Sequence, residues 1–407
     1  MEQSPIQHLK ERLKIQKLTA EHLTQFNELL RYVFQVTNED LQEVGWEDEE
    51  IERSKLPVLE KANVVGWFDG DKLASQIAVY PFEVNIYGKK YKMGGVTGVG
   101  TYPEYANLGL INELMLHCLT EMCQAGQTIS YLYPYSIPYY RKKGWEIISD
   151  KMNYTMKDTQ LPKPTEVYGM VERVDFTYPD ILHIYQQFSE TRHGAMIRGE
   201  IAWEEYWRWE TDETIAAIYY DPDGLPQGYV FYNISNDVFD MKEMVYLNQE
   251  ARNGLWNYIT AHFSMVDEVK GRTYTNEPIA FLMEDSAITE TIKPYIMARI
   301  VDVKQFLIDY PFEKVQGKLH FIVKDPLLTW NRGIFSVEIA EDGQVTIGEE
   351  ETAHPIEVSI QMLTTMLMGY RRPAYLHKYD KISGAKNSLE LLERMLPKGS
   401  AYFSDYF

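Results

Sequence analysis

The stretch that decides the fold lies between Gly94 and Leu116 and reads GGVTGVGTYPEYANLGLINELML. It begins with β-forming residues and continues through a Pro-containing turn. Gly109 then opens a segment with apolar residues at helical spacing, namely Leu110, Ile111, Leu114 and Met115. The pattern predicts a strand, a turn and a helix N-terminus. Backbone N–H groups at such a turn, together with the positive end of the helix dipole, suit a diphosphate or similar anion. Glycine would let that backbone approach the ligand closely, although a plain connection shows the same pattern.

Length and composition limit the classes of protein that the chain can represent. With 407 residues it is too long for one ordinary core, and two or three domains are expected. Its 45% apolar and 25% charged residues are typical of a folded protein. The formal net charge of −20 makes nucleic acid and anionic membranes poor partners. The same charge would attract a cationic small molecule or a basic protein, or would simply keep the protein soluble.

The sequence shows no targeting signal, membrane span or metal-ligand spacing. The first residues, MEQSPIQHLKERLK, are charged and lack the apolar segment of a signal peptide, and no segment reaches the length of a membrane span. Cys118 and Cys123 fall on different faces of one predicted helix, which suits packing in a reducing compartment better than a disulfide or a metal pair. The nine histidines show no metal spacing either. A cytoplasmic protein without a metal is expected.

The first third of the chain predicts a helix and then a sheet built around the opening stretch. Its expected elements are a helix at 18–36, strands within 63–101, a helix at 108–125, a strand at 127–133, a short helix at 136–144 and a strand at 145–149. Turns at Gly70 and Gly88 would join strands as hairpins. Gly144 is expected in the left-handed cap position of the short helix. The acidic run Glu47 to Glu50 would be a loop or a solvated helix, and it could also attract a cationic substrate.

The other two thirds predict two further units. Their expected elements are helices at 179–190, 251–265, 359–370 and 385–396, with strands within 215–247 and 318–350. The Trp-rich stretch IAWEEYWRWE, with Trp203, Trp207 and Trp209, would pack in the core or line a pocket, and packing is the commoner role. The transition before the helix at Ala251 repeats the strand-to-helix order of the opening stretch without its phosphate-binding pattern.

The order of these elements, with YPEYANLGL after the fourth strand and YYRKKGW after the fifth, resembles the GNAT family of acetyl-CoA-dependent N-acetyltransferases. More narrowly, it resembles the Eis-type branch. The resemblance implies an α/β (α+β) fold class with tandem GNAT folds, whose central sheets are mixed and mostly antiparallel. It implies a GNAT domain at 1–155, a second GNAT-like domain without a cofactor motif at 156–293, and a sterol-carrier-protein-like domain at 294–407.

In that family the co-substrate acetyl-CoA binds to the turn and to the strand ahead of it. By resemblance, the cofactor-binding residues here are Val99, Gly100, Thr101, Asn107, Leu108, Gly109, Leu110, Ile111, Asn112, Tyr135 and Ser136. The turn departs from the family pattern, because it reads ANLGLI at 106–111 and lacks the basic side chains that flank the phosphates. Weaker binding is expected, by about 1.5–3 kcal/mol for each lost contact.

The resemblance also implies two catalytic residues. The tyrosine acid of the family lies four residues before the Gly that matches Gly144, which makes Tyr140 the donor to the departing thiolate, whereas Tyr139 is expected to point elsewhere. In Eis-type proteins a C-terminal carboxylate on an aromatic residue enters the active site. The carboxylate of Phe407 would therefore accept the amine proton or hold the amine. The aromatic residues of the final SDYF argue against a frayed tail.

The sequence therefore predicts an acetyl-CoA-dependent N-acetyltransferase whose amine substrate attacks directly within a ternary complex. The resemblance adds an aminoglycoside-like polyamine or a lysine amine as the cationic substrate, and a homo-oligomer, a hexamer, as the assembly. No metal, nucleic acid or membrane partner is expected. The alternative is a non-catalytic binding protein that has lost CoA and holds an apolar ligand in its C-terminal domain.

Overall fold

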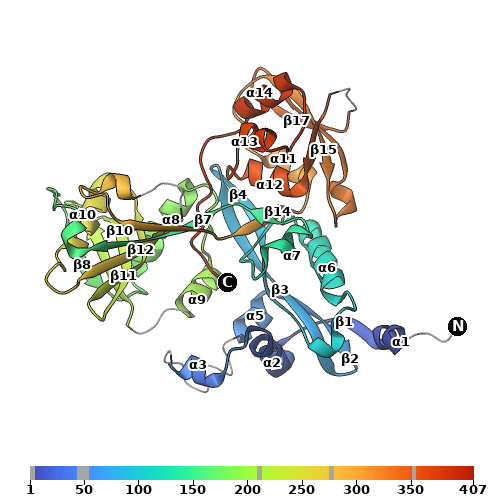
Figure 1. Cartoon of the computed structure of the whole chain (residues 1–407), viewed down its shortest axis with the longest axis horizontal. Helices are drawn as coiled ribbons and strands as arrows, with labels where there is room; N and C mark the ends of the chain where they lie inside the picture. The colour runs from blue at the N-terminus through green and yellow to red at the C-terminus, as the bar shows by residue number, and fades with distance from the viewer. Residues whose placement is uncertain (1–4, 44–54, 209–212, 275–278, 351–353) are drawn as a thin grey trace.

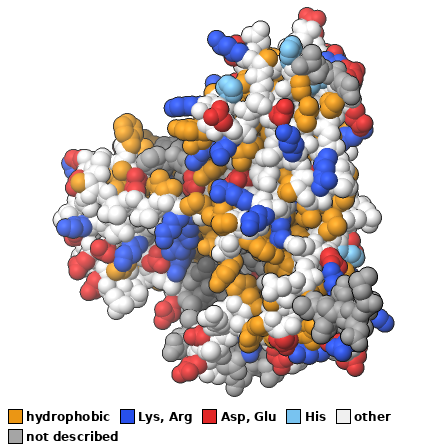
Figure 2. Space-filling view, turned by 45° about the vertical axis from the view of Figure 1, so that its right-hand side comes forward, with side chains coloured by type: hydrophobic (Ala, Val, Ile, Leu, Met, Phe, Trp, Pro, Cys, Tyr) orange, Lys and Arg blue, Asp and Glu red, His pale blue; other side chains and the backbone are white. Residues whose placement is uncertain are grey.

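The structure is a computed structural model (Figure 1). It describes residues 5–43, 55–208, 213–274, 279–350 and 354–407. Three β-sheets with helices packed against them form the three parts of the molecule, and the C-terminus returns to the middle of the molecule, between the first and second parts (Figure 1). Figure 2 shows Lys and Arg side chains gathered in the middle of one face, among hydrophobic side chains. A local basic surface therefore exists on a chain that is acidic overall.

The first sheet contains the opening stretch of the sequence. Its strands, in spatial order, are β1 (Leu13–Lys17), β2 (Asn63–Asp69), β3 (Lys72–Ile86), β4 (Lys89–Thr101), β5 (Ile129–Leu132), β14 (Met297–Ile300) and β6 (Glu146–Ile147). The helices of this part are α1 (Pro5–Arg12), α2 (Leu23–Phe34), α3 (Asn38–Glu43), α5 (Leu56–Lys61), α6 (Leu110–Gln124) and α7 (Ile137–Arg141), with 3₁₀ turns at Ala20–His22 and Pro103–Tyr105. β4 and β5 are its parallel pair, and the other neighbours run antiparallel.

Both faces of the central strand β3 are covered. Successive side chains of a strand point to opposite faces, so Ile77 and Val79 pack with Leu114 of α6 in one apolar cluster. Tyr80, on the opposite face, belongs to a second cluster that also contains Phe407. The last residue of the sequence is thus part of the core beside the first sheet.

The second sheet has the same plan. Its strands, in spatial order, are β13 (Thr289–Pro294), β7 (Asp150–Lys157), β12 (Glu268–Thr273), β11 (Val238–Tyr246), β10 (Pro226–Ser235), β9 (Ile215–Tyr220) and β8 (Met170–Val174). The helices are α8 (Pro179–Thr191), α9 (Glu200–Arg208) and α10 (Gln249–Thr260), with 3₁₀ turns at Asp158–Gln160 and Ala280–Leu282. β11 and β12 are its parallel pair. In both parts, one strand of the parallel pair comes before the main helix along the chain and the other strand comes after it.

The third sheet is smaller. Its strands, in spatial order, are β17 (Val345–Gly348), β16 (Gly333–Ile339), β15 (Gly317–Lys324) and β18 (Ile356–Ser359). The helices are α11 (Val303–Asp309), α12 (Ile360–Leu367), α13 (Pro373–Lys378) and α14 (Lys386–Met395), with a 3₁₀ turn at Thr329–Asn331. Among the helices that the structure describes, none is both long enough and apolar enough to cross a membrane.

The two larger sheets exchange one strand. β7 follows β6 along the chain but pairs with β12 and β13, whereas β14 pairs with β5 and β6 of the first sheet. The exchanged strands occupy corresponding places, each next to the second strand of the parallel pair. The division at residues 155 and 293 remains a prediction, and the strand pairing crosses both of these boundaries.

The fold class expected from the sequence is confirmed, since the sheets are mixed and mostly antiparallel. The helix expected at 251–265 ends at Thr260. The elements that were not predicted include strands β1, β7, β12, β13, β14 and β18 and helices α1, α5, α11 and α13. Trp203 is buried and stacks on Trp207, in agreement with a packing role. Trp209 and the acidic run Glu47 to Glu50 lie outside the described residues.

Candidate active site

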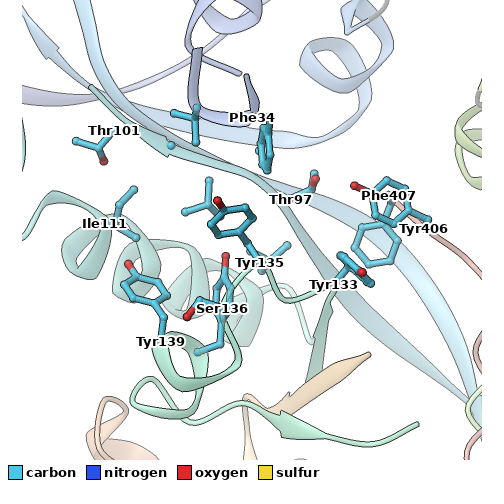
Figure 3. Close-up of a pocket in the computed structure, with 16 residues that line it drawn as sticks. Phe34, Thr97, Thr101, Ile111, Tyr133, Tyr135, Ser136, Tyr139, Tyr406 and Phe407 are labelled. Carbon is cyan, nitrogen blue, oxygen red and sulfur yellow. The ribbon is translucent and has the colours of Figure 1, made fainter. Parts of the chain in front are cut away.

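A cavity of about 480 Å³ lies where β4 and β5 diverge. The two strands pair in parallel only as far as Gly95 and Tyr131, and residues 96–101 of β4 then form one wall of the cavity. Figure 3 shows the cavity extending between two groups of side chains: Thr101, Ile111 and Tyr139 at one end, and Tyr133, Tyr406 and Phe407 at the other. Diverging strands of one sheet thus open an elongated site.

A β-bulge shapes the wall formed by β4. The register between β3 and β4 shifts between Gln76 and Ala78. Gly98 has a φ of 60°, in the left-handed region that side chains rarely adopt. Beyond the bulge, Ser75 Oγ donates a hydrogen bond of 3.0 Å to Gly100 O. The end of β4 is therefore held on its β3 side, while its other edge faces the cavity.

The turn after β4 prepares the N-terminus of α6. Asn107 and Gly109 both have left-handed backbones, with φ of 62° and 75°. Nothing lies within 4 Å of a Cβ built on Gly109, so other residues do not crowd this position. The left-handed φ alone explains why the residue is a glycine. The first backbone bonds of the helix run from Asn112 N and Glu113 N to Gly109 O. The N–H groups ahead of them point out of the helix and can bind an anion.

The predicted cofactor-binding residues fall into two groups. The cavity is lined by Val99, Gly100, Thr101, Ile111, Tyr135 and Ser136. The other five lie in the turn and the first turn of α6 and do not line the cavity: Asn107, Leu108, Gly109, Leu110 and Asn112. The side chains of Leu108 and Leu110 are buried in the apolar core, so they can offer a ligand only their backbone.

Tyr140 lines the cavity from α7. The helix ends in a Schellman motif, in which Trp145 N bonds to Tyr140 O and Gly144 N to Arg141 O. Gly144 has a φ of 96°, as its predicted cap position requires. Tyr140 is 7% exposed, and its hydroxyl has no hydrogen-bond partner among the residues that the structure describes. Burial, with a smaller contribution from Tyr139, raises the pKa of Tyr140 to about 12, so the hydroxyl remains a donor at neutral pH.

The expectation that Tyr139 points elsewhere is wrong. Both tyrosines line the cavity, and their rings pack edge to face with centroids 5.2 Å apart. Helical geometry separates adjacent residues by about 100°, but a short helix at the edge of a cavity can present two neighbouring side chains to it. Position in the motif therefore does not by itself distinguish the two hydroxyls.

Arg299 of β14 supports the end of α7. It donates a hydrogen bond to Lys143 O and forms an ion pair with Asp325, in which both side chains are fully buried. A Cβ on Gly144 would lie 2.7 Å from Arg299 Nη1. The glycine is thus required by its φ and by this close approach. The exchanged strand β14 thereby links α7 to the third part of the molecule.

Phe407 lines the other end of the cavity. Its side chain is 8% exposed and packs edge to face on Phe82 and Tyr80, at centroid distances of 5.1 and 6.2 Å. A Cβ on Gly95 would lie 2.9 Å from the ring of Phe407. β4 therefore carries a glycine at the point where the last ring docks.

A buried ion-pair network fixes the residues before Phe407. Arg198 pairs with Glu243 of β11 at 2.8 Å and with Asp405 at 2.7 Å, and its side chain is fully buried. Tyr295 Oη donates a hydrogen bond of 2.9 Å to Asp405 O. The C-terminal tail, which is the segment after α14 (residues 396–407), is thus held by the second sheet and places its last residue beside the first.

Several residues that line the cavity were not predicted: Val33, Phe34, Val96, Thr97, Gly98, Tyr133, Tyr139 and Tyr406. Some of them lie in the two stretches that the sequence singles out, the opening stretch and SDYF. Phe34 and Tyr133 carry no sequence signal, because aromatic residues of helices and strand ends are common in cores. Among the described residues, no group of three or more His, Cys, Asp or Glu side chains is placed to hold a metal ion.

Three models of known domains match the chain. Residues 14–148 match an acetyltransferase (GNAT) domain, residues 194–300 a second acetyltransferase (GNAT) domain, and residues 303–404 a sterol carrier protein domain. Fold and matches together define an acyltransferase enzyme. The two GNAT matches span more than half of the sequence, and the chain belongs to the GNAT acetyltransferases. The predicted architecture, two GNAT folds before a sterol carrier protein domain, is confirmed.

Solved structures share the whole arrangement. A protein of Enterococcus faecalis, described as a conserved protein of unknown function and a probable N-acyltransferase, is 29% identical and has a TM-score of 0.87 over 97% of this chain and 99% of that one. A GCN5-related N-acetyltransferase from Anabaena variabilis is 23% identical, with a TM-score of 0.84 over 97% and 100% of the two chains. Eis1 from Mycobacterium abscessus is 18% identical, with a TM-score of 0.80 over 97% and 100%, and shares the fold. No curated protein matches the chain.

Proposed function

We propose that this protein transfers an acetyl group from acetyl-CoA to an amine of a cationic substrate, by direct attack while both are bound. One observation carries the proposal: Tyr140 and Phe407, far apart in sequence, line one cavity beside the open edge of β4. In the reaction a C–N bond forms and the C–S bond breaks. The amine loses a proton, and the departing thiolate gains one or is stabilised by a donor.

The site fits the shape of the acetyl donor. The cavity is elongated, is lined by the second half of β4, and has the open N-terminus of α6 at the end where Ile111 lies. A thin arm that carries a diphosphate needs these two features. When bound, acetyl-CoA would supply the activated acetyl group.

Tyr140 would act on the thiolate mainly as a hydrogen-bond donor. Its pKa of about 12 lies above the value of about 8.5 for an ordinary thiol, so full proton transfer is uphill by about 5 kcal/mol. A hydrogen bond to a charged group is worth about 1.5–3 kcal/mol without that transfer. Tyr140→Phe should therefore lower kcat at least tenfold while calorimetry shows unchanged binding of CoA. An equal or larger loss in Tyr139→Phe would contradict the assignment.

The carboxylate of Phe407 would hold the substrate ammonium, and the proton that the amine loses would pass to solvent. An α-carboxyl with a pKa near 3.5 and an alkyl ammonium near 10 differ by about six units, which makes direct transfer uphill by roughly 8 kcal/mol. Electrostatic attraction needs no proton transfer. It would position the amine at the end of the cavity opposite Ile111.

The substrate class and the assembly follow from the family resemblance. We propose an aminoglycoside-like polyamine or a lysine amine as the acceptor, which is consistent with the net charge of −20. We also propose a homohexamer in the cytoplasm, with neither nucleic acid nor membrane as a partner. Light scattering of the purified protein tests the assembly.

An assay of thiol release tests the activity. The protein is incubated with acetyl-CoA and a panel of amines that includes a polyamine, an aminoglycoside and a lysine peptide, with a neutral sugar as the control. Free thiol and an acetylated amine are expected with at least one amine and not with the sugar. If millimolar acetyl-CoA gives neither thiol nor heat of binding, the enzyme proposal is wrong. The result would then favour the alternative, a non-catalytic binding protein.

A further inference from the structure

Lys143 is a buried lysine that has no anionic partner among the described residues. It follows α7 and is only 9% exposed. Its Nζ contacts Asn112 Oδ1 and lies over the ring of Tyr139, 4.4 Å from the centroid. In the described part of the chain no carboxylate lies within ion-pair distance of this ammonium. Lysine is rarely buried to this extent unless it is paired, so the site lacks a counter-charge.

The two neighbouring cations differ from Lys143. Arg141 donates hydrogen bonds of 2.7–2.9 Å to both carboxylate oxygens of Glu146. Lys142 is exposed to solvent. Burial, and to a smaller degree the charge of Lys142, lowers the pKa of Lys143. An anion bound next to Lys143 would offset both effects.

The ammonium lies beside the N-terminus of α6. Its partner Asn112 is in the first turn of that helix, where the N–H groups of Leu110 and Ile111 precede the first intrahelical bonds. Ile111 and Tyr139 line the cavity at the end away from Phe407 (Figure 3). A buried positive charge, the positive end of a helix dipole and one end of the cavity therefore meet at one place.

We propose that Lys143 binds the diphosphate of CoA and so replaces the basic side chain missing from the turn at 106–111. The inference rests on the proposed function, because it names a residue that holds the acetyl donor. The lysine side chain is long and flexible, so its ammonium can exchange the neutral oxygen of Asn112 for a phosphate oxygen and form a stronger, charge-assisted bond. Lys143 lies after Tyr140, outside the turn, where the turn pattern of the family gives no signal.

Lys143→Met tests the proposal, with Lys142→Met as the matched control. Calorimetry with CoA should show a Kd at least tenfold higher for Lys143→Met and unchanged for Lys142→Met. With S-acetylpantetheine, which has the thioester and the arm without the diphosphate, kcat/KM of Lys143→Met should stay within twofold of that of the unaltered protein. This second donor also shows that the variant is folded. With dephospho-CoA, which keeps the diphosphate and lacks the 3′-phosphate, the tenfold difference in Kd should persist.

The outcomes separate this inference from the proposed function. If the unaltered protein binds no CoA, the proposed function fails before Lys143 is considered. If it binds CoA and Lys143→Met binds it equally well, the inference about Lys143 is overturned while the function stands. An equal loss with S-acetylpantetheine would make Lys143 structural. If the difference in Kd between Lys143→Met and the unaltered protein disappears with dephospho-CoA, Lys143 contacts the 3′-phosphate instead. Either this result or the equal loss with S-acetylpantetheine overturns the assignment of Lys143 to the diphosphate.

Discussion

The two larger sheets diverge at corresponding places, and the structure fills the two divergences differently. In the first sheet, β4 and β5 stop pairing at Gly95 and Tyr131, and a cavity follows. In the second, β11 and β12 pair only from Val238 to Asp240. Beyond that point Glu243 of β11 is bonded to Arg198 and to Ser404 of the tail. One architecture thus yields a cavity in the first sheet and an anchor for the chain in the second.

The helices that follow β4 and β11 along the chain, α6 and α10, differ in how their N-termini are capped. The N-cap residue of α10 is Asn248, whose side chain accepts a hydrogen bond of 2.8 Å from Ala251 N. The N-cap residue of α6 is Gly109, which has no side chain to cap the helix. The helix α10 thus satisfies one of its own N-terminal donors, whereas no N-cap side chain does so in α6. This contrast explains how the second GNAT domain can keep the fold and serve mainly to hold the tail.

The largest expected effect comes from removing the cation of the second divergence. Arg198→Met would leave the buried carboxylates of Glu243 and Asp405 facing each other without a counter-charge. Breaking a buried pair in this way destabilises a protein by about 3–5 kcal/mol. Urea unfolding should show this loss. A difference below about 1 kcal/mol would mean that the network does not anchor the tail.

A matched variant separates charge from packing. Arg198→Met combined with Glu243→Gln and Asp405→Asn removes all three charges and keeps side chains of similar size. Since replacing a complete buried ion-pair network by neutral groups is often nearly neutral, the triple variant should recover much of the stability. If it is as unstable as Arg198→Met alone, packing of the guanidinium on Tyr185 and Trp203 contributes more to stability than its ion pairs do.

The path of the tail between the two sheets depends on a neutral histidine. His193 Nδ1 accepts a hydrogen bond from Tyr87 N at 3.2 Å, which leaves Nε2 to donate to Met368 O at 3.0 Å, while His193 O accepts from Tyr402 N. Burial lowers the pKa of His193 from 6.5 to about 4. One imidazole thereby joins all three parts of the molecule where the tail enters the second sheet.

This lowered pKa predicts a loss of stability in acid. Above pH 6.5 His193 is neutral in both the folded and the unfolded chain and contributes fully. As the pH falls from 6.5 to 4, only the unfolded chain takes up the proton, so up to about 3 kcal/mol is lost. Urea unfolding between pH 7.5 and 4 should show the decrease, and His193→Gln should show a shallower one. Parallel pH profiles would exclude this role for His193.

The sequence predicts the parts of this molecule that local patterns determine. Hairpin turns, the start of α6 and the Schellman motif at Gly144 each depend on a few adjacent residues, and all appear where expected. The exchange of β7 and β14 was not predicted, because either strand satisfies the pattern of either sheet. Tyr140 and Phe407 were found through resemblance to a family. Lys143 and Arg198 were missed, because their environment is made by segments distant in sequence.

The smallest of these effects separates anchoring from chemistry at the end of the tail. Two residues added after Phe407 would move the carboxylate while Asp405 keeps its bond to Arg198. We expect kcat to fall about a hundredfold, near 2.7 kcal/mol, with little change in unfolding or in CoA binding. Phe407→Leu keeps the carboxylate and loses the ring contacts with Phe82 and Tyr80, so a smaller loss is expected. Full activity in the extended chain would assign the tail a purely structural role, since the anchor would then suffice without a positioned carboxylate.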